Sequence, residues 1–229
     1  MDWRGGRAYE QAMRPGIADA DAAGRCRLDA MARWLQDVAY ADLVDAGFEG
    51  RGVWIVRRTR IRVERFPRFG ELLTLRTFCS GFGRFSAERR TSIAGETAAV
   101  EMVSLWVCLD PARGRPMRFP PDFVAVYEES AAGREANVRL RHPDPPAGAA
   151  SSPWTFRAVE MDSVGHINNS HYWTPLEEEI AAGPEPDSID AEIEYRDPAM
   201  PGEVALVRDG SSLWIVGAEG AVHASLLRA

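Results

Sequence analysis

The feature that most constrains this fold is a weak internal repeat. One copy reads DADAAGRCRLDAMARW in the first part of the chain, and the other reads EMDSVGHINNSHYW in the last third. Two pairs of residues match at the same offset of 141 positions: Asp21 with Asp162 and Gly24 with Gly165. Arg25 then falls opposite His166. A repeat at this distance predicts two copies of one supersecondary unit within a single chain.

Similar elements follow each copy in the same order. The stretches MARWLQDVAYADLVDAG and YWTPLEEEIAAG are helical in pattern, and each ends in glycine, the usual residue just past a helix end. RIRVERFPRFGELLTLR and AEIEYRDPAMPGEVALV then predict a strand, a proline-containing bend and a Gly-Glu pair that opens another strand. Each half therefore reads as a short strand, one helix and an antiparallel meander of strands, which is α+β. Periodicity alone leaves two unrelated domains as the alternative.

A segment rich in Ala, Gly, Pro and Ser separates the two halves and is typical of a linker. We place the boundary near residue 145, which gives an N-terminal domain with linker over 1–145 and a C-terminal domain over 146–229. A helix wrapped by a long antiparallel sheet, present twice, is what the hotdog architecture would look like in sequence.

Composition narrows the class of protein. The chain has 229 residues, of which 45% are hydrophobic and 27% charged, as expected of a globular protein. No apolar run approaches the roughly 18 residues of a membrane span, and the N-terminus lacks the apolar segment of a secretory signal. Three widely spaced cysteines fit reduced thiols better than a disulfide framework, so we expect a cytoplasmic protein. The net charge of −7 argues against a nucleic-acid-binding protein.

Several segments together resemble the acyl-ACP thioesterase family over nearly the whole chain. In the first half these are GVWIVRRTRIRVERFPRFGELLTLRTF and SLWVCLDPARGRPMRFP. In the second half, MDSVGHINNSHYW is similar to the family's Asp-x-Asn-x-His-Val-Asn-Asn-x-x-Tyr signature, and IEYRDPAMPGE to its Glu-Tyr-Arg segment. The resemblance implies two fused hotdog domains, an acyl pocket in the first and the chemistry in the second. It also implies a hydrolase of fatty-acyl thioesters, most fittingly acyl-ACP, acting in fatty acid biosynthesis and lipid metabolism.

The same resemblance places the family's catalytic aspartate on Asp162 and its histidine on His166. The family's asparagine falls on Val164 and its downstream glutamate falls near Pro198. Asp162 can act as the base for a water molecule, although capping a helix is its common alternative role. We expect the amides near Gly165 to Ile167 to form an oxyanion site at a helix N-terminus, and we expect His166 to orient the water or protonate the leaving thiolate. Two asparagines are expected to secure the loop and the helix start: Asn168 and Asn169.

Substrate-contacting residues are proposed from residue type. Trp34, Trp54 and Trp173 are candidates for the acyl pocket, with an ordinary core position as the alternative. ACP is acidic, so arginine clusters could steer it despite the negative total charge. The carrier-binding candidates are Arg57, Arg58, Arg115 and Arg118.

Other functions remain open. A hydratase of the MaoC type would space its aspartate and histidine one residue further apart and add a proline. A non-catalytic acyl-thioester binding protein is the runner-up, motivated by Val164 and Pro198, and CoA is the alternative carrier. We expect no cofactor and no metal, because the four histidines show no recognised ligand spacing. Glu177 could replace the missing carboxylate, with a solvated position as its alternative. We expect a monomer or a homodimer.

Overall fold

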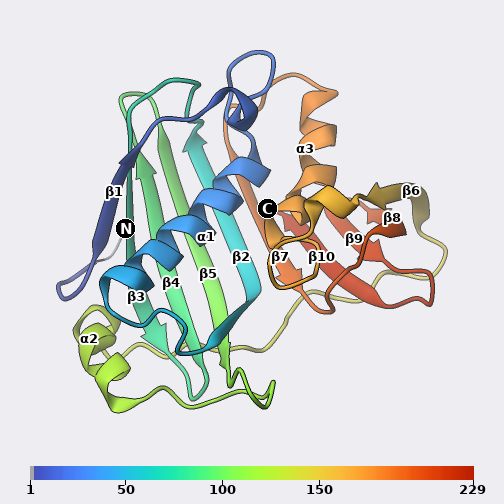
Figure 1. The fold of residues 1–229 in the computed structure, drawn as a ribbon. Coiled ribbons are helices and arrows are strands. Elements are labelled where there is room, and N and C mark those ends of the chain that lie inside the picture. The colour runs from blue at the N-terminus through green and yellow to red at the C-terminus, as the bar shows by residue number, and fades with distance from the viewer. Residues whose placement is uncertain (1–2) are drawn as a thin grey trace.

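The computed structural model describes residues 3–229 and shows two similar units side by side (Figure 1). The elements of the first unit are β1 (Tyr9–Met13), the 3-10 helix η1 (Ile17–Asp19), α1 (Leu28–Asp45), β2 (Val53–Arg65), β3 (Leu73–Phe82), β4 (Ser86–Ala94), β5 (Ala99–Leu109) and α2 (Pro121–Ala131). Those of the second are β6 (Ala150–Phe156), the 3-10 helices η2 (Ala158–Glu160) and η3 (Asn169–Trp173), α3 (Thr174–Ala181), β7 (Ile189–Tyr195), β8 (Gly202–Asp209), β9 (Ser212–Val216) and β10 (Val222–Arg228).

The strands form one continuous antiparallel sheet. Their order is β1-β3-β4-β5-β2-β7-β10-β9-β8-β6, so β2 and β7 meet in the middle. Figure 1 shows α1 lying across the first half of the sheet and α3 beside the second half. The predicted α+β class, with two fused hotdog units, is confirmed by this arrangement.

The core follows from the spacing of apolar residues on α1. Leu28, Met31, Leu35 and Val38 recur every three or four positions and are fully buried against the sheet. One apolar cluster continues from these residues through the β2–β7 junction to Trp173 and the second unit. The two units therefore share a core as well as a sheet.

The central junction is stabilised by backbone and side-chain contacts. β2 pairs with β7 from Arg58 opposite Glu194 to Val63 opposite Ile189. On its surface, Arg60 donates two hydrogen bonds of 2.7 Å to the carboxylate of Asp190. Such bidentate pairing adds geometric specificity across the junction.

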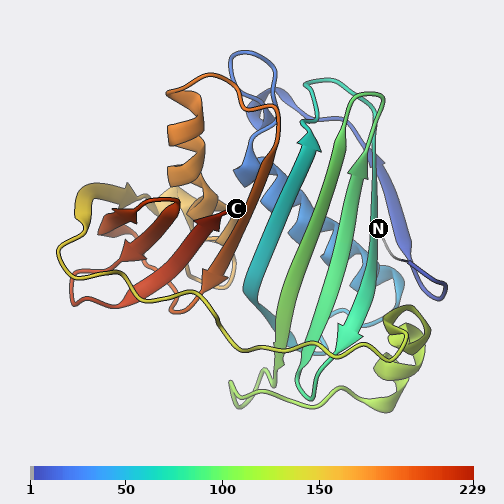
Figure 2. The ribbon, with the colours of Figure 1, turned by 180° about the vertical axis from the view of Figure 1, so that it is seen from behind.

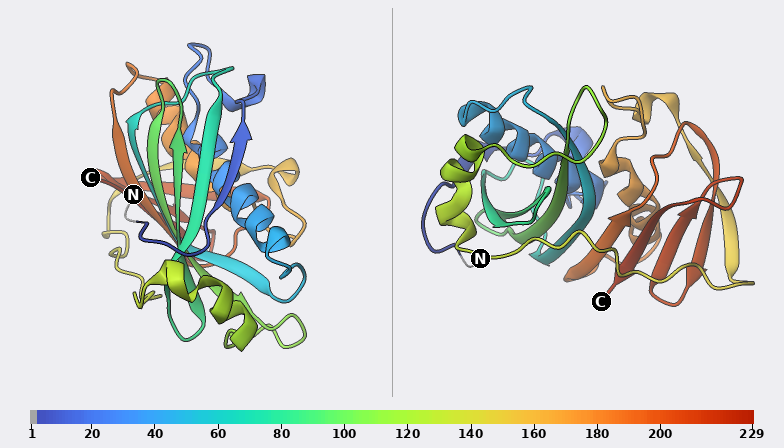
Figure 3. Two further views of the ribbon diagram at one scale, coloured as in Figure 1. Left: turned by 90° about the vertical axis from the view of Figure 1, so that its left-hand side faces the viewer. Right: turned by 90° about the horizontal axis from the view of Figure 1, so that it is seen from below.

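Residues 132–149 connect the units as a strap across the face of the sheet opposite α1 (Figure 2). The view from below in Figure 3 shows the strap running along the outside of both units. The proposed boundary at residue 145 lies within this strap, and it stays a proposal. Within residues 3–229, no helix combines the length and apolar character that crossing a bilayer requires.

One helix was not expected from the sequence. α2 begins after Pro120 with Pro121 at its first position, a favourable place for proline, and it buries Phe123 and Tyr127 four residues apart. The run FPPDFVAVYEESA therefore carries a helix signal, which was not among the expected elements. α2 packs against β3 and closes one end of the first unit.

Candidate functional site

The motif around Asp162 forms a tight turn. The N–H of Asp162 donates to the carbonyl of His166 at 2.9 Å, and the N–H of Gly165 donates to the carbonyl of Asp162 at 3.1 Å. Gly165 has a φ of +91°, which residues other than glycine rarely adopt, so glycine suits this reversal of the chain direction. The carboxylate oxygen Oδ1 of Asp162 accepts the N–H of Val164 at 2.9 Å. Asp162 therefore stabilises its own turn and does not cap a helix.

The helix expected at Gly165 begins later. η3 starts at Asn169, and its N-cap is Asn168, whose Oδ1 accepts the N–H of Ser170 at 2.9 Å. The amides of Gly165 and Ile167 already donate to carbonyls, the latter to Ala199 at 3.0 Å. The amides of Gly165 and Ile167 therefore do not form the expected oxyanion site at a helix N-terminus. The chain makes a hydrogen-bonded turn at these residues before the helix begins.

His166 contributes two groups without a protein partner. Within residues 3–229, neither its backbone N–H nor its half-buried imidazole makes a hydrogen bond. In the first copy of the repeat the equivalent N–H, that of Arg25, donates to the carboxylate of Asp21 at 2.9 Å. The N–H of His166, like that of Ser163, is therefore an amide of this turn without a protein partner in the described part of the chain, and it can donate to a developing oxyanion.

Asn168 connects Asp162 to the other unit. Its Nδ2 donates to Oδ2 of Asp162 at 3.3 Å, and its Oδ1 accepts Nε2 of Gln36 on α1 at 3.1 Å. Asn169 is linked through its carbonyl, which accepts the hydroxyl of Tyr195 at 3.1 Å. Gln36 was not among the sequence candidates. The repeat offset of 141 could have identified it, because it pairs Gln36 with Glu177.

An apolar cavity of about 370 Å³ lies beside this turn. α1 and the sheet of the first unit form its walls, and Val164 of the Asp162 turn contributes to its lining. Val164 is 61% exposed, so it offers an apolar surface at the point where cavity and turn meet. Further lining residues are Ala39, Leu43, Trp54, Cys79, Trp106 and Phe123.

The three candidate tryptophans occupy different environments. Trp54 lines the cavity and stacks on Phe119 at a centroid distance of 5.6 Å. Trp34 is buried in the shared core. Trp173 is also fully buried, and its Nε1–H donates to the hydroxyl of Tyr195 at 3.1 Å. Trp54 is therefore the one of these three tryptophans that lines the cavity.

A buried charged network lies next to the cavity. Asp42 of α1 is 1% exposed and accepts Nε of Arg7 at 2.8 Å and the hydroxyl of Tyr127 at 3.0 Å. Arg89, which lines the cavity, lies 2.7 Å from the same carboxylate. Burial raises the pKa of Tyr127 to about 12, so its hydroxyl stays protonated and donates. This network fixes α1, β4 and α2 around one wall.

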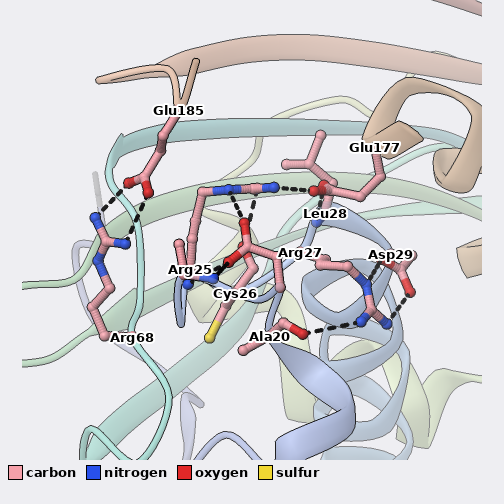
Figure 4. Close-up of polar contacts among 11 residues, drawn as sticks. Ala20, Arg25, Cys26, Arg27, Leu28, Asp29, Arg68, Glu177 and Glu185 are labelled. Carbon is pink, nitrogen blue, oxygen red and sulfur yellow. Dashed lines mark hydrogen bonds and ion pairs between the residues drawn. The ribbon is translucent and has the colours of Figure 1, made fainter. Parts of the chain in front are cut away.

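Glu177 does not replace the missing carboxylate. It is buried on α3, where its carboxylate accepts Arg25 Nη2 and the N–H of Leu28, the latter at 2.9 Å (Figure 4). The expected solvated position is also wrong for this residue. Its carboxylate ties the start of α1 to α3, because both of its oxygens are bonded to the first unit.

The arginines proposed for carrier binding lie on the outer face of the sheet or in a neighbouring loop. Arg57 donates to the carbonyl of Arg196 at 3.0 Å, and Arg58 lies 3.7 Å from Glu192. Arg57 lines a hollow of about 800 Å³ together with Pro116, whereas Trp54 of the same strand faces the cavity. Two further candidates flank Pro116 and are exposed: Arg115 and Arg118. The structure does not bring this group together with the Asp162 turn.

One histidine has carboxylates beside it, which the sequence spacing did not indicate. Donor atoms of His142, Glu192 and Glu194 lie within 4.8 Å of one another. The carboxylate of Glu194 accepts the backbone N–H groups of Arg141 and His142 at 2.7 and 3.0 Å. These contacts hold the strap against the second unit, and they occupy both oxygens of Glu194.

Comparisons with known proteins agree with this architecture. The family model described as the acyl-ACP thioesterase N-terminal domain matches residues 6–127. An uncharacterized protein of Mycobacterium tuberculosis is 26% identical over 206 residues, covering 89% of this chain and 82% of that protein. The chloroplastic oleoyl-acyl carrier protein thioesterase 1 of Arabidopsis thaliana is 23% identical over 171 residues, covering 63% of this chain and 47% of that protein.

Solved structures share the fold of both units. An acyl-ACP thioesterase from Bacteroides thetaiotaomicron superposes with a TM-score of 0.79 at 15% identity, with 96% of each chain covered. A putative oleoyl thioesterase from Lactobacillus plantarum gives a TM-score of 0.77 at 17% identity, covering 97% of this chain and 95% of that one. At these identities the likeness concerns the fold.

Proposed function

The chain belongs to the acyl-ACP thioesterase family and is accordingly a thioester hydrolase, and we propose that its substrate is a fatty-acyl thioester carried on ACP. One observation carries the proposal: the apolar cavity of the first unit is lined in part by Val164, in the turn that bears Asp162 and His166. An acyl chain in this cavity would bring its thioester carbonyl to the turn. Pockets of a few hundred Å³ are of the size that binds small apolar ligands.

The residues of the turn have distinct tasks in the proposed reaction. Asp162 accepts a proton from a water molecule, whose oxygen attacks the carbonyl carbon. The N–H of His166 donates to the oxyanion that develops on the carbonyl oxygen. When the oxyanion collapses, the C–S bond breaks and the thiolate leaves with its electron pair. The proton that Asp162 took from the water molecule neutralises the thiolate, either directly or by passing through the imidazole of His166, which leaves a fatty acid and the carrier thiol and returns both side chains to their starting state.

The carrier contact is assigned to the two exposed arginines of the outer loop, Arg115 and Arg118. Arg57 and Arg58 already have partners within the chain, so their charge is less available to an acidic carrier. A patch of this kind accelerates association chiefly at low salt. CoA thioesters remain the alternative substrates, because the phosphates of CoA also bind arginine.

A non-catalytic binding protein is the second candidate function. Val164 stands where the family's asparagine is expected, and the family's glutamate is expected near Pro198. Both oxygens of Asp162 also accept hydrogen bonds within the chain, from Val164 and Asn168. These two features would suit a site that holds a thioester without activating water.

Hydrolysis of acyl-ACP and acyl-CoA series of graded chain length tests the proposal. We expect a higher kcat/KM for acyl-ACP and a maximum at one range of chain lengths. Reversing the charge of Arg115 and Arg118 should lower the rate with acyl-ACP at low salt and leave acyl-CoA less affected. Binding of acyl thioesters without hydrolysis of any of them would favour the second candidate.

A further inference from the structure

The two copies of the repeat are alike in detail. The 3-10 helices η1 and η2 occupy positions related by the offset of 141. Isolated bridges close both turns, Ala20 with Cys26 and Met161 with Ile167. In both copies the N–H of the aspartate donates at 2.9 Å to the carbonyl four residues later. The offset therefore identifies equivalent side chains in two related sites: Asp21 and Asp162, Arg25 and His166, Glu177 and Gln36.

In each site the helix of one unit faces the turn of the other. At the first site, α3 supplies Glu177 to the turn of the first unit (Figure 4). Arg25 lies between Glu177 and Asp21, with its Nε 2.9 Å from Asp21 Oδ2, and its side chain is 1% exposed. Opposite charges satisfy one another there, so this site is closed and structural.

The second site has the same arrangement with an amide in place of the carboxylate. α1 supplies Gln36, whose Nε2 donates to Asn168 Oδ1 at 3.1 Å and to the carbonyl of Ala32 at 3.4 Å. Because both neighbours are acceptors, they fix the orientation of the Gln36 amide. Its Oε1 has no hydrogen-bond donor within residues 3–229, and Gln36 lines the acyl cavity together with Val164.

We propose that Gln36 is a positioning residue of the Asp162 site, contributed by the opposite unit. It acts through Asn168: three donors converge on Asn168 Oδ1, namely Gln36 Nε2 and the N–H and hydroxyl of Ser170, and this directs Asn168 Nδ2 to Asp162. The hydrogen bond from Asn168 holds the carboxylate of Asp162 in a fixed orientation for the proposed proton transfer. The inference rests on the proposed function, since it assigns a role in that reaction.

Position 36 carries glutamine, whereas the equivalent position 177 carries glutamate, and this difference has a physical reason. Glu177 pairs with Arg25, and the residue equivalent to Arg25 in the second site is His166. A carboxylate at position 36 would therefore lack a permanently charged cation as its partner. It would also lie two hydrogen bonds from Asp162 and disfavour ionisation of that base. An uncharged amide can position Asn168 without this repulsion.

Two variants of Gln36 and one matched control test the role. Gln36→Leu keeps size and helix propensity but removes the hydrogen bond, and we expect kcat to fall about tenfold, the scale of one lost hydrogen bond. Gln36→Glu should move the acid limb of the kcat profile to higher pH, by up to about one pH unit. Two titratable groups near Asp162 are unchanged in both variants: His166 in the same turn and Tyr172, which interacts electrostatically with Asp162. Glu177→Gln, the reverse change at the equivalent position of the closed site, should lower the melting temperature and leave the pH profile unchanged.

The outcomes separate this inference from the proposed function. If wild type hydrolyses acyl thioesters and both folded Gln36 variants keep its kcat and pH profile, Gln36 has no positioning role. A shift of the acid limb in Glu177→Gln would also contradict the inference, because it would make the effect one of general charge. A wild type without hydrolysis would overturn the proposed function instead. Circular dichroism and melting temperatures establish that each variant is folded.

Discussion

At the scale of single residues, the site depends on the carboxylate of Asp162, which both stabilises the turn and is the proposed base. Asp162 accepts the N–H of Val164 with one oxygen and Nδ2 of Asn168 with the other. Each carboxylate oxygen has two lone pairs, so both can still accept a proton or a hydrogen bond from water. Structural and catalytic tasks are therefore compatible in the same side chain.

Asp162→Asn separates these two tasks. The asparagine Oδ1 can still accept the N–H of Val164, so the turn should persist, while the proton acceptor is lost. We expect kcat to fall roughly 10²-fold or more, the usual scale for a lost general base, with a small decrease in melting temperature. Single-turnover hydrolysis and calorimetry measure the two effects. Undiminished hydrolysis in this variant would exclude Asp162 as the base.

The cysteines provide a test of an alternative nucleophile. Burial raises the pKa of the Cys26 thiol to about 12 and those of Cys79 and Cys108 to about 11. Thiols with raised pKa values stay protonated at neutral and mildly alkaline pH, and the thiolate is the reactive form. We expect slow alkylation of the native protein by iodoacetamide and full activity afterwards. Rapid loss of activity linked to modification of Cys79, which lines the cavity, would point to a thiol mechanism.

Sequence reasoning at this scale identified the turn but not its surroundings. The motif singled out Asp162 and His166, and the offset equated them with Asp21 and Arg25. It placed the helix start too early, because the hydrogen bond between Gly165 and Asp162 closes a turn before the chain becomes helical at Asn169. Contacts across units are set by tertiary packing, which a local motif does not encode.

At the scale of elements, α1 is held by a buried charge as well as by its apolar face. Asp42 joins α1 to Arg7 near the N-terminus, to Arg89 on β4 and to Tyr127 on α2. No local sequence pattern indicates this network, because its members are far apart in the chain. The apolar spacing of α1 is visible in the sequence, whereas no local pattern distinguishes Asp42 from an acidic residue on a solvated helix face.

Asp42→Ala should destabilise the protein strongly. Removing the carboxylate leaves Arg89 buried without its ion-pair partner, and breaking a buried pair costs about 3–5 kcal/mol in the free energy of unfolding. Urea denaturation should show a lower midpoint with an unchanged slope. Asp45→Ala is the matched control, because Asp45 is exposed and pairs with the same Arg7, so we expect a loss of about 1 kcal/mol or less. Equal effects of the two substitutions would contradict this role of the network.

At the scale of the whole molecule, the two units depend on each other. β2 and β7 form the centre of the sheet, and the apolar cluster runs through both units. The strap adds contacts, since its His142 and Arg141 amides bind Glu194 of β7. Each unit alone would expose one edge of the central pair, and long exposed edges favour aggregation. The repeat indicated two similar units, but it could not show that they would merge into one sheet.

A split chain tests both the proposed boundary at residue 145 and this dependence. We expect fragments 1–145 and 146–229 to be insoluble or unfolded when produced separately, because each lacks half of the β2–β7 pairing. Produced together, they should copurify as a one-to-one complex with hydrolytic activity, since the cut falls in a strap without helix or strand. A cut between Gly95 and Glu96 is the control. It interrupts the β4–β5 hairpin within one unit, whose strands pair from Ser86 to Ala94, and should give no active complex. A stable, monomeric fragment 146–229 with dispersed NMR signals would show that the second unit folds without the first, and the shared sheet would then be an association of independent domains.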